Sequence, residues 1–185
     1  SQQAYQEVIY QNIQDEIKPY DKEGVLERHF LNSRGAIARF DRGAVEIRVT
    51  DLQESPLMDI AIADTLIVLI QCLVSEKWTG NEAQMAWDEK RLFTIFKQCM
   101  TNGEQALIED SGYLAMFGVA EKQCTAQELW IHISEQINGS LSEDSATGLK
   151  RILKYGTLST RILKAINNDF RPENIVDGNK ETYWT

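Results

Sequence analysis

Apolar and polar residues follow helical spacing over most of this chain. Residues 4–18 carry apolar side chains three or four positions apart, until Pro19 ends the pattern. The same period, together with helix-start and helix-stop residues, predicts further helices over residues 57–74, 83–100, 125–137, 143–155 and 158–166. A weaker helical pattern covers residues 104–118, with a break around Gly112. Beyond Asn167 the chain is polar and rich in turn residues, so we expect a loose tail over residues 171–185.

The longest apolar run, residues 57–74, is the strongest helix prediction. Ser55 and Pro56 precede it, and Pro suits the first position of a helix. The run is apolar nearly all round but contains Asp59 and Asp64. We therefore expect the central buried helix of a core and not a membrane span.

A change to two-residue alternation predicts a β-hairpin in the first third of the chain. Residues 36–40 and 44–50 are short, and the second stretch alternates apolar and polar side chains. Between them lie Asp41, Arg42 and Gly43, and Gly supplies the positive φ that a tight turn needs.

The hairpin gathers charged residues on one face. If Arg42 and Gly43 form a two-residue turn, Arg39 lies opposite Glu46 and Ile37 lies opposite Arg48. Side chains alternate along a strand, so Arg39, Glu46 and Arg48 then share a face. Arg34 lies just before the first strand and can approach the same surface.

These elements predict the α+β class. We expect a small antiparallel β-hairpin or sheet followed by a predominantly helical bundle, in a single domain over residues 1–170. A chain of 185 residues is long enough for a core of its own.

Composition narrows the possible functions. The net charge of -9 argues against a general nucleic-acid binder, which carries a basic surface. The three cysteines are widely spaced and form no CxxC pair, so disulfide frameworks and zinc sites are not indicated. The first residues are polar and indicate no signal peptide, and we expect a cytoplasmic protein without a membrane partner.

Arginine is concentrated around the hairpin. Five of the nine arginines lie between residues 28 and 48 of this acidic chain: Arg28, Arg34, Arg39, Arg42 and Arg48. Arg suits bidentate binding of phosphate or carboxylate, and Glu46 offers oxygen ligands to Mg²⁺. The set suits phosphoryl transfer to a carboxylate. The alternative is a solvated face whose Arg39–Glu46 ion pair contributes under about 1 kcal/mol.

The residues around the hairpin resemble a known family. The run from Leu31 to Ala63, LNSRGAIARFDRGAVEIRVTDLQESPLMDIAIA, resembles the plant and proteobacterial type of glutamate–cysteine ligase and its carboxylate–amine ligase relatives. It is similar, more distantly, to the active-site strands of glutamine synthetase. The matching positions, in order, are Arg34, Arg39, Glu46, Arg48, Asp51 and Pro56.

The resemblance implies a glutamine synthetase-like fold and an ATP-dependent ligase. ATP would phosphorylate the γ-carboxylate of glutamate, and the amine of cysteine or another compound would displace phosphate. By position, Glu46 corresponds to a Mg²⁺ ligand, and Arg34 and Arg39 to residues that contact ATP phosphates. Arg48 corresponds to a catalytic contact with the transferred phosphate or the substrate carboxylate, and Arg39 shares that role.

The family pattern is only partly present. Enzymes of this family are longer, and their other metal-binding carboxylates precede this region, so the chain matches one wall of a site. We therefore expect it to be inactive alone, with a missing amino-terminal part or another subunit as a partner. The alternatives are a non-catalytic domain that binds anions or a partner, and a purely structural helical domain. His29 and His132 are expected to have structural or surface roles.

Overall fold

The computed structural model describes residues 2–167 and divides the chain into two compact units. The first unit is Ser1–Asp51 and the second is Leu52–Thr185, so the division falls between the hairpin and the long apolar helix. The sequence did not predict this division, and the single domain expected over residues 1–170 stays a prediction. The expected tail, residues 171–185, lies outside the described residues.

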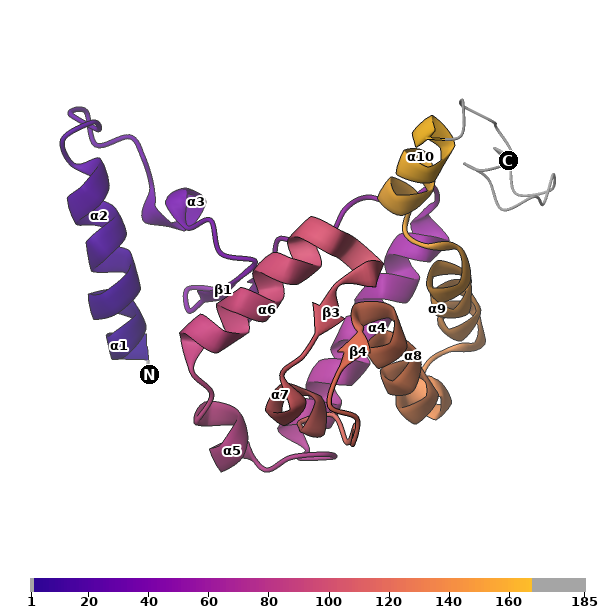
Figure 1. Ribbon diagram of the computed structural model, residues 1–185. Helices are drawn as coiled ribbons and strands as arrows, with labels where there is room; N and C mark the ends of the chain where they lie inside the picture. The colour runs from indigo at the N-terminus through magenta and orange to yellow at the C-terminus, as the bar shows by residue number, and fades with distance from the viewer. Residues whose placement is uncertain (1, 168–185) are drawn as a thin grey trace. The chain divides into compact units, whose positions relative to one another are not determined.

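The first unit joins a helix to the β-hairpin (Figure 1). Its helical elements are α1 Gln2–Tyr5, the π-helical turn η1 Gln6–Tyr10, α2 Gln11–Ile17 and α3 Arg28–Leu31. The first three follow one another without a gap, which confirms the helix predicted over residues 4–18. Tyr10 and Ile37, each 1% exposed, are the buried hydrophobic residues in the described part of this unit.

The hairpin forms as predicted but with a different register. Strands β1 Ala36–Arg39 and β2 Ala44–Ile47 pair antiparallel. Ile37 faces Glu46 and Arg39 faces Ala44, so the expected Arg39–Glu46 pairing is wrong by two residues.

The register differs from the expected one because the turn has four residues and not two. Residues 40–43 form a four-residue connection in which Arg42 N donates to Arg39 O at 3.0 Å, and Gly43 has φ +59°. A one-residue slip exchanges the faces of a strand, whereas a two-residue shift preserves them. Arg39, Glu46 and Arg48 therefore still share a face.

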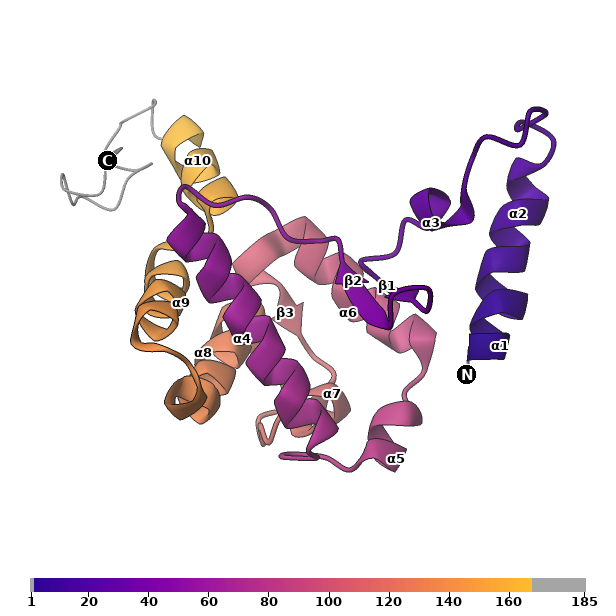
Figure 2. The same cartoon turned by 180° about the vertical axis from the view of Figure 1, so that it is seen from behind.

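The second unit is mainly helical (Figures 1 and 2). Its elements are α4 Pro56–Val74, α5 Asn81–Met85, α6 Glu89–Asn102, η2 Gly103–Gln105, β3 Leu107–Ile108, α7 Ser111–Ala115, β4 Cys124–Thr125, α8 Ala126–Ile137, η3 Asn138–Ser140, α9 Glu143–Tyr155 and α10 Leu158–Asn167. The helical segment expected over residues 104–118 is wrong in part: η2 and α7 are short helical turns, and between them β3 pairs with β4. The α+β class is confirmed.

Predicted capping residues explain where α8 begins. Thr125 Oγ1 accepts from Glu128 N at 3.2 Å, and Glu128 Oε2 accepts from Thr125 N at 2.7 Å. This reciprocal pair satisfies two amides that a helix start leaves without partners. The core of the unit packs around α8, with Ile133 and Leu114 almost fully buried.

Helices α4 and α9 pack at unusually short range. A Cβ on Gly148 would lie 2.6 Å from Ala61 Cβ, so only a glycine fits this position without movement. Near the start of α9, Ser145 Oγ donates to Asp64 Oδ2 at 2.5 Å. A polar bond and a close backbone approach therefore join these two helices.

Helix α4 is not buried all round, contrary to expectation. Its inner face buries four residues, whereas the opposite face exposes Leu57, Ile60, Ile67, Ile70 and Val74. Among the described residues it is the one helix long and apolar enough to cross a membrane, and 22% of its most apolar stretch is buried. That test rests on length and composition alone.

Candidate functional site

The site suggested by the sequence is a connected set of charges on the hairpin, which we call the charged face: Arg39, Asp41, Glu46 and Arg48. Arg39 Nη1 donates to Glu46 Oε2 at 2.8 Å, and Arg48 Nε donates to Glu46 Oε1 at 2.8 Å. Arg39 also holds Asp41 through two bonds, at 3.0 and 2.8 Å. Two guanidinium groups and two carboxylates thus offset one another's charge.

Arg48 also joins the hairpin to α3. Its Nη1 donates to Asn32 O at 2.7 Å and its Nη2 donates to His29 O at 2.9 Å. These carbonyls lie at the end of a helix, where no intrahelical donor reaches them. One guanidinium therefore binds a carboxylate and two backbone oxygens at once, as its planar fork of donors permits.

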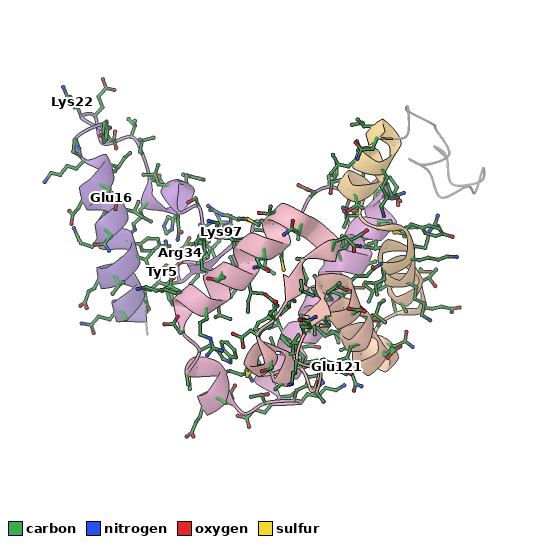
Figure 3. All side chains as sticks on the ribbon, viewed as in Figure 1. Tyr5, Glu16, Lys22, Arg34, Lys97 and Glu121 are labelled. Atoms are coloured by element: carbon green, nitrogen blue, oxygen red, sulfur yellow. The ribbon has the colours of Figure 1, made fainter. Side chains whose placement is uncertain are left out.

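Asn32 connects Arg34 to this arrangement. The Asn32 side chain is fully buried; its Nδ2 donates to Tyr5 Oη at 3.0 Å, and its Oδ1 accepts from Arg34 Nη1 at 3.4 Å. Tyr5 and Arg34 are labelled in Figure 3. Arg34 thus contacts the residue whose carbonyl Arg48 binds, which places it at the edge of the charged face.

The guanidinium groups shift the ionisation of their partners. Hydrogen bonds from Arg39 lower the pKa of Asp41 from 3.8 to about 2. The pKa of Glu46 is lowered chiefly by its bond from Arg39 and then by its bond from Arg48. The bonds to Asp41 and Glu46 in turn raise the pKa of Arg39.

These shifts imply that the first unit loses stability in acid. A carboxylate whose pKa is lower in the folded state stabilises that state above its unfolded pKa and loses the effect as pH falls through the folded value. For Asp41 this window runs from about pH 4 to pH 2. We expect the protection of the β1 and β2 amides, relative to their intrinsic exchange rates at the same pH, to fall across that window.

The variant Asp41→Asn tests whether this carboxylate causes the acid dependence, and helix α8 serves as the control. This variant should show a shallower acid dependence in the hairpin, because one of the two titrating carboxylates is gone, while the exchange of α8 should follow the wild-type curve. An unchanged pH profile in Asp41→Asn would show that the Arg39–Asp41 pair does not contribute.

The charged face by itself does not fit a magnesium site. Both Glu46 oxygens already accept from guanidinium groups, and no group of three or more His, Cys, Asp or Glu in residues 2–167 could hold a metal. Mg²⁺ prefers several oxygen ligands in near-octahedral geometry. The role of Glu46 as a metal ligand stays a prediction.

The histidines have structural contacts, and two other residues were missed. His29 Nδ1 lies 3.0 Å from Tyr10 Oη, and His132 Nε2 lies 2.9 Å from Phe117 O. Sequence reasoning did not single out Asp41 as a partner of Arg39, nor Asn32 as a buried anchor. Asp41 had a signal, since it precedes the turn glycine by two residues.

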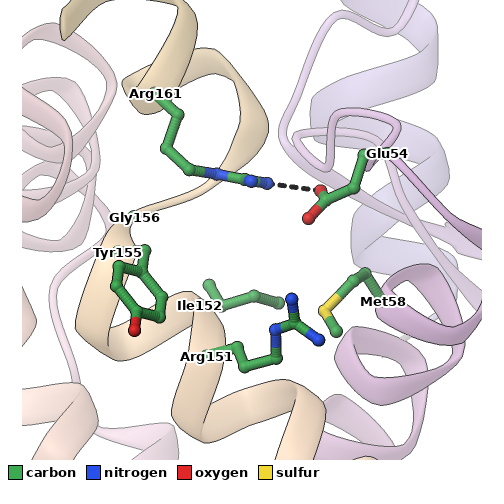
Figure 4. Close-up of a pocket in the computed structure, with 7 residues that line it drawn as sticks. All are labelled: Glu54, Met58, Arg151, Ile152, Tyr155, Gly156 and Arg161. Atoms are coloured by element: carbon green, nitrogen blue, oxygen red, sulfur yellow. Dashed lines mark hydrogen bonds and ion pairs between the residues drawn. The ribbon is translucent and has the colours of Figure 1, made fainter. Parts of the chain in front are cut away.

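A small cavity of about 10 Å³ lies among described residues of the second unit (Figure 4). Its lining residues are Glu54, Met58, Arg151, Ile152, Tyr155, Gly156 and Arg161. The Arg161 side chain is 8% exposed, and its guanidinium donates to Glu54, which connects α10 to the segment before α4. A space of this size holds about one water molecule and no substrate.

Comparisons of the chain with protein-family models, with curated proteins and with solved structures found no match.

Proposed function

We propose that this chain is part of an ATP-dependent carboxylate–amine ligase that joins the γ-carboxylate of glutamate to an amine such as cysteine. The observation that carries the proposal is the hairpin, which brings Arg39, Glu46 and Arg48 into direct contact. Their order and spacing also follow the family pattern described above. In this reaction ATP transfers its γ-phosphoryl group to the carboxylate, and the amine then attacks the acyl phosphate and releases phosphate.

The arginines would supply the electrostatic part of this chemistry. Negative charge spreads over the phosphoryl oxygens during transfer, and fixed guanidinium groups stabilise it without reorganising. In the structure Glu46 accepts hydrogen bonds from both Arg39 and Arg48. A phosphate group would therefore have to compete with Glu46 for these guanidinium groups. A magnesium ion would need ligands beyond those of the charged face.

The proposal is tested in the natural gene product that contains this sequence. We expect it to form ADP and phosphate from ATP only when glutamate and an amine are both present. Glu46→Gln should lower turnover by about 10–100-fold, as changes to a residue that orients the groups of a metal site typically do. Arg42→Met is the control, because the Arg42 side chain is 70% exposed in the same hairpin.

Two outcomes would overturn the assignment. The first is that the natural gene product containing this sequence, here called the parent protein, forms no ADP in response to glutamate. The second is that its Glu46→Gln variant keeps full turnover. Circular dichroism of each variant is needed because Glu46 also stabilises the hairpin.

A second candidate function follows from the closed ion-pair network. Arg39, Glu46 and Arg48 already satisfy one another, as they would in a non-catalytic anion-binding or partner-binding domain derived from such a ligase. Calorimetry of the 185-residue chain with Mg-ATP separates the two. Micromolar binding would favour a retained nucleotide site, and no heat would favour a non-catalytic domain that binds a partner and not the nucleotide.

A further inference from the structure

The first unit contains a pocket of about 220 Å³ that shares only Asp41 with the charged face. It is lined by Gln2, Gln6, Tyr10, Arg28, His29, Phe40 and Asp41, and we call it the Arg28 pocket. We propose that the Arg28 pocket binds a small organic anion, a carboxylate or a phosphate ester, that carries a flat apolar end.

Arg28 supplies the positive charge for this ligand. Its guanidinium lies 4.7 Å from the centre of the Tyr10 ring, and its Nη1 donates to Gln6 Oε1 at 3.0 Å. Within residues 2–167 it forms no ion pair with a carboxylate, unlike Arg39 and Arg48. A guanidinium has five N–H donors, and the described residues use one of those on Arg28.

The remaining charge in the pocket is already offset. Asp41 lines one side, but Arg39 holds both of its carboxylate oxygens. The balance inside the pocket is therefore the single positive charge of Arg28. A small anion gains from this arrangement, because charge-assisted bonds to a guanidinium are stronger than bonds between neutral groups.

The pocket walls suit a ligand that is partly flat and apolar. Phe40 is 40% exposed and packs edge-on against Tyr5, with ring centres 5.6 Å apart. Tyr10 is buried beneath Arg28, and its hydroxyl lies 3.0 Å from His29 Nδ1. The aromatic side chains are thus held by other residues, and the Phe40 ring keeps apolar surface available.

The pocket is independent of the proposed ligase chemistry in its residues and in its test. Arg28 is not among the positions that match the family pattern, and binding needs no turnover. A failed binding experiment would leave the ligase proposal unaffected, and an inactive parent protein would leave the pocket unaffected.

The experiment titrates the 185-residue chain with three probes of similar shape: benzoate, phenyl phosphate and the neutral benzamide. The chain has only two histidines, so the imidazole NMR signals of His29 and His132 can be assigned with one substitution. We expect benzoate or phenyl phosphate to shift the His29 signal with at least about tenfold higher affinity than benzamide. The anion that binds with the higher affinity shows whether the pocket prefers a carboxylate or a phosphate ester.

His132 serves as an internal control, because it lies in the second unit and contacts Phe117 O. Arg28→Met should weaken anion binding at least about tenfold, whereas Lys22→Met removes the same charge from an exposed loop and should leave it unchanged. Wild-type protection of the β1 and β2 amides from exchange shows that the variant is folded.

Three results would overturn the proposal. They are equal binding of benzamide and both anions, unchanged anion affinity in Arg28→Met, and no shift of His29 with any probe up to its solubility limit. The comparison of charged and neutral probes uses the wild-type chain, so it stands even if Arg28→Met fails to fold.

Discussion

Gly148→Val is expected to lower the free energy of unfolding of the second unit by about 1–3 kcal/mol, since overpacking a close helix contact forces the backbones apart. A Cβ at this position would meet Ala61 Cβ at 2.6 Å, with Met58 Cε at 3.6 Å. Met58 can change rotamer, but Ala61 can move only with α4. Urea unfolding followed by tryptophan fluorescence measures the effect, because all four tryptophans lie beyond residue 51.

Two alanine variants test the explanation by contact. Gly148→Ala should destabilise the unit even though Ala is favoured over Gly in a helix by about 1 kcal/mol. Gly139→Ala is the matched control, since a Cβ there meets nothing within 4 Å. Ala61→Gly should relieve Gly148→Ala in a double-mutant cycle, and strictly additive effects would contradict the proposed clash.

Local sequence signals predicted the helices well because the decisive interactions are local. The Thr125–Glu128 capping pair and the glycine after α9 are encoded within a few residues of the helix ends that they define. Pairing of β3 with β4 joins residues 107 and 125, so helical spacing alone could not reveal it. The burial of α4 was overestimated for a related reason, since hydrophobicity shows that a helix can be buried but not which neighbours cover it.

For the charged face too, features set by neighbouring residues were predictable from the sequence, and contacts between distant residues were not. Alternation along two short strands was enough to place Arg39, Glu46 and Arg48 on one side. The length of the turn decided the register, and that depended on backbone bonds around Phe40 and Gly43. The binding of Arg48 to α3 carbonyls joins residues 16 and 19 positions apart, and no spacing rule anticipates it.

Arg48→Met is expected to destabilise the first unit by about 2–4 kcal/mol. The substitution removes two bonds to the carbonyls of Asn32 and His29 and one to Glu46. Hydrogen bonds with a charged partner contribute about 1.5–3 kcal/mol each, and the 25% exposure of Arg48 reduces the sum. Faster amide exchange in β1 and β2, with unchanged tryptophan fluorescence from the second unit, is the expected signature.

Two further variants separate a structural role of Arg48 from a catalytic one. Arg48→Lys should recover little of the protection, because one ammonium group lacks the planar fork that reaches two carbonyls and a carboxylate. Arg42→Met, on the exposed turn, should leave hairpin exchange unchanged. If Arg48→Met abolishes ligase turnover in the parent protein while hairpin exchange stays at the wild-type rate, Arg48 acts on the substrate. Alternatively, turnover and amide protection of the hairpin fall together in Arg48→Met, and Arg48→Lys restores neither. Arg48 then acts mainly by holding the hairpin against α3.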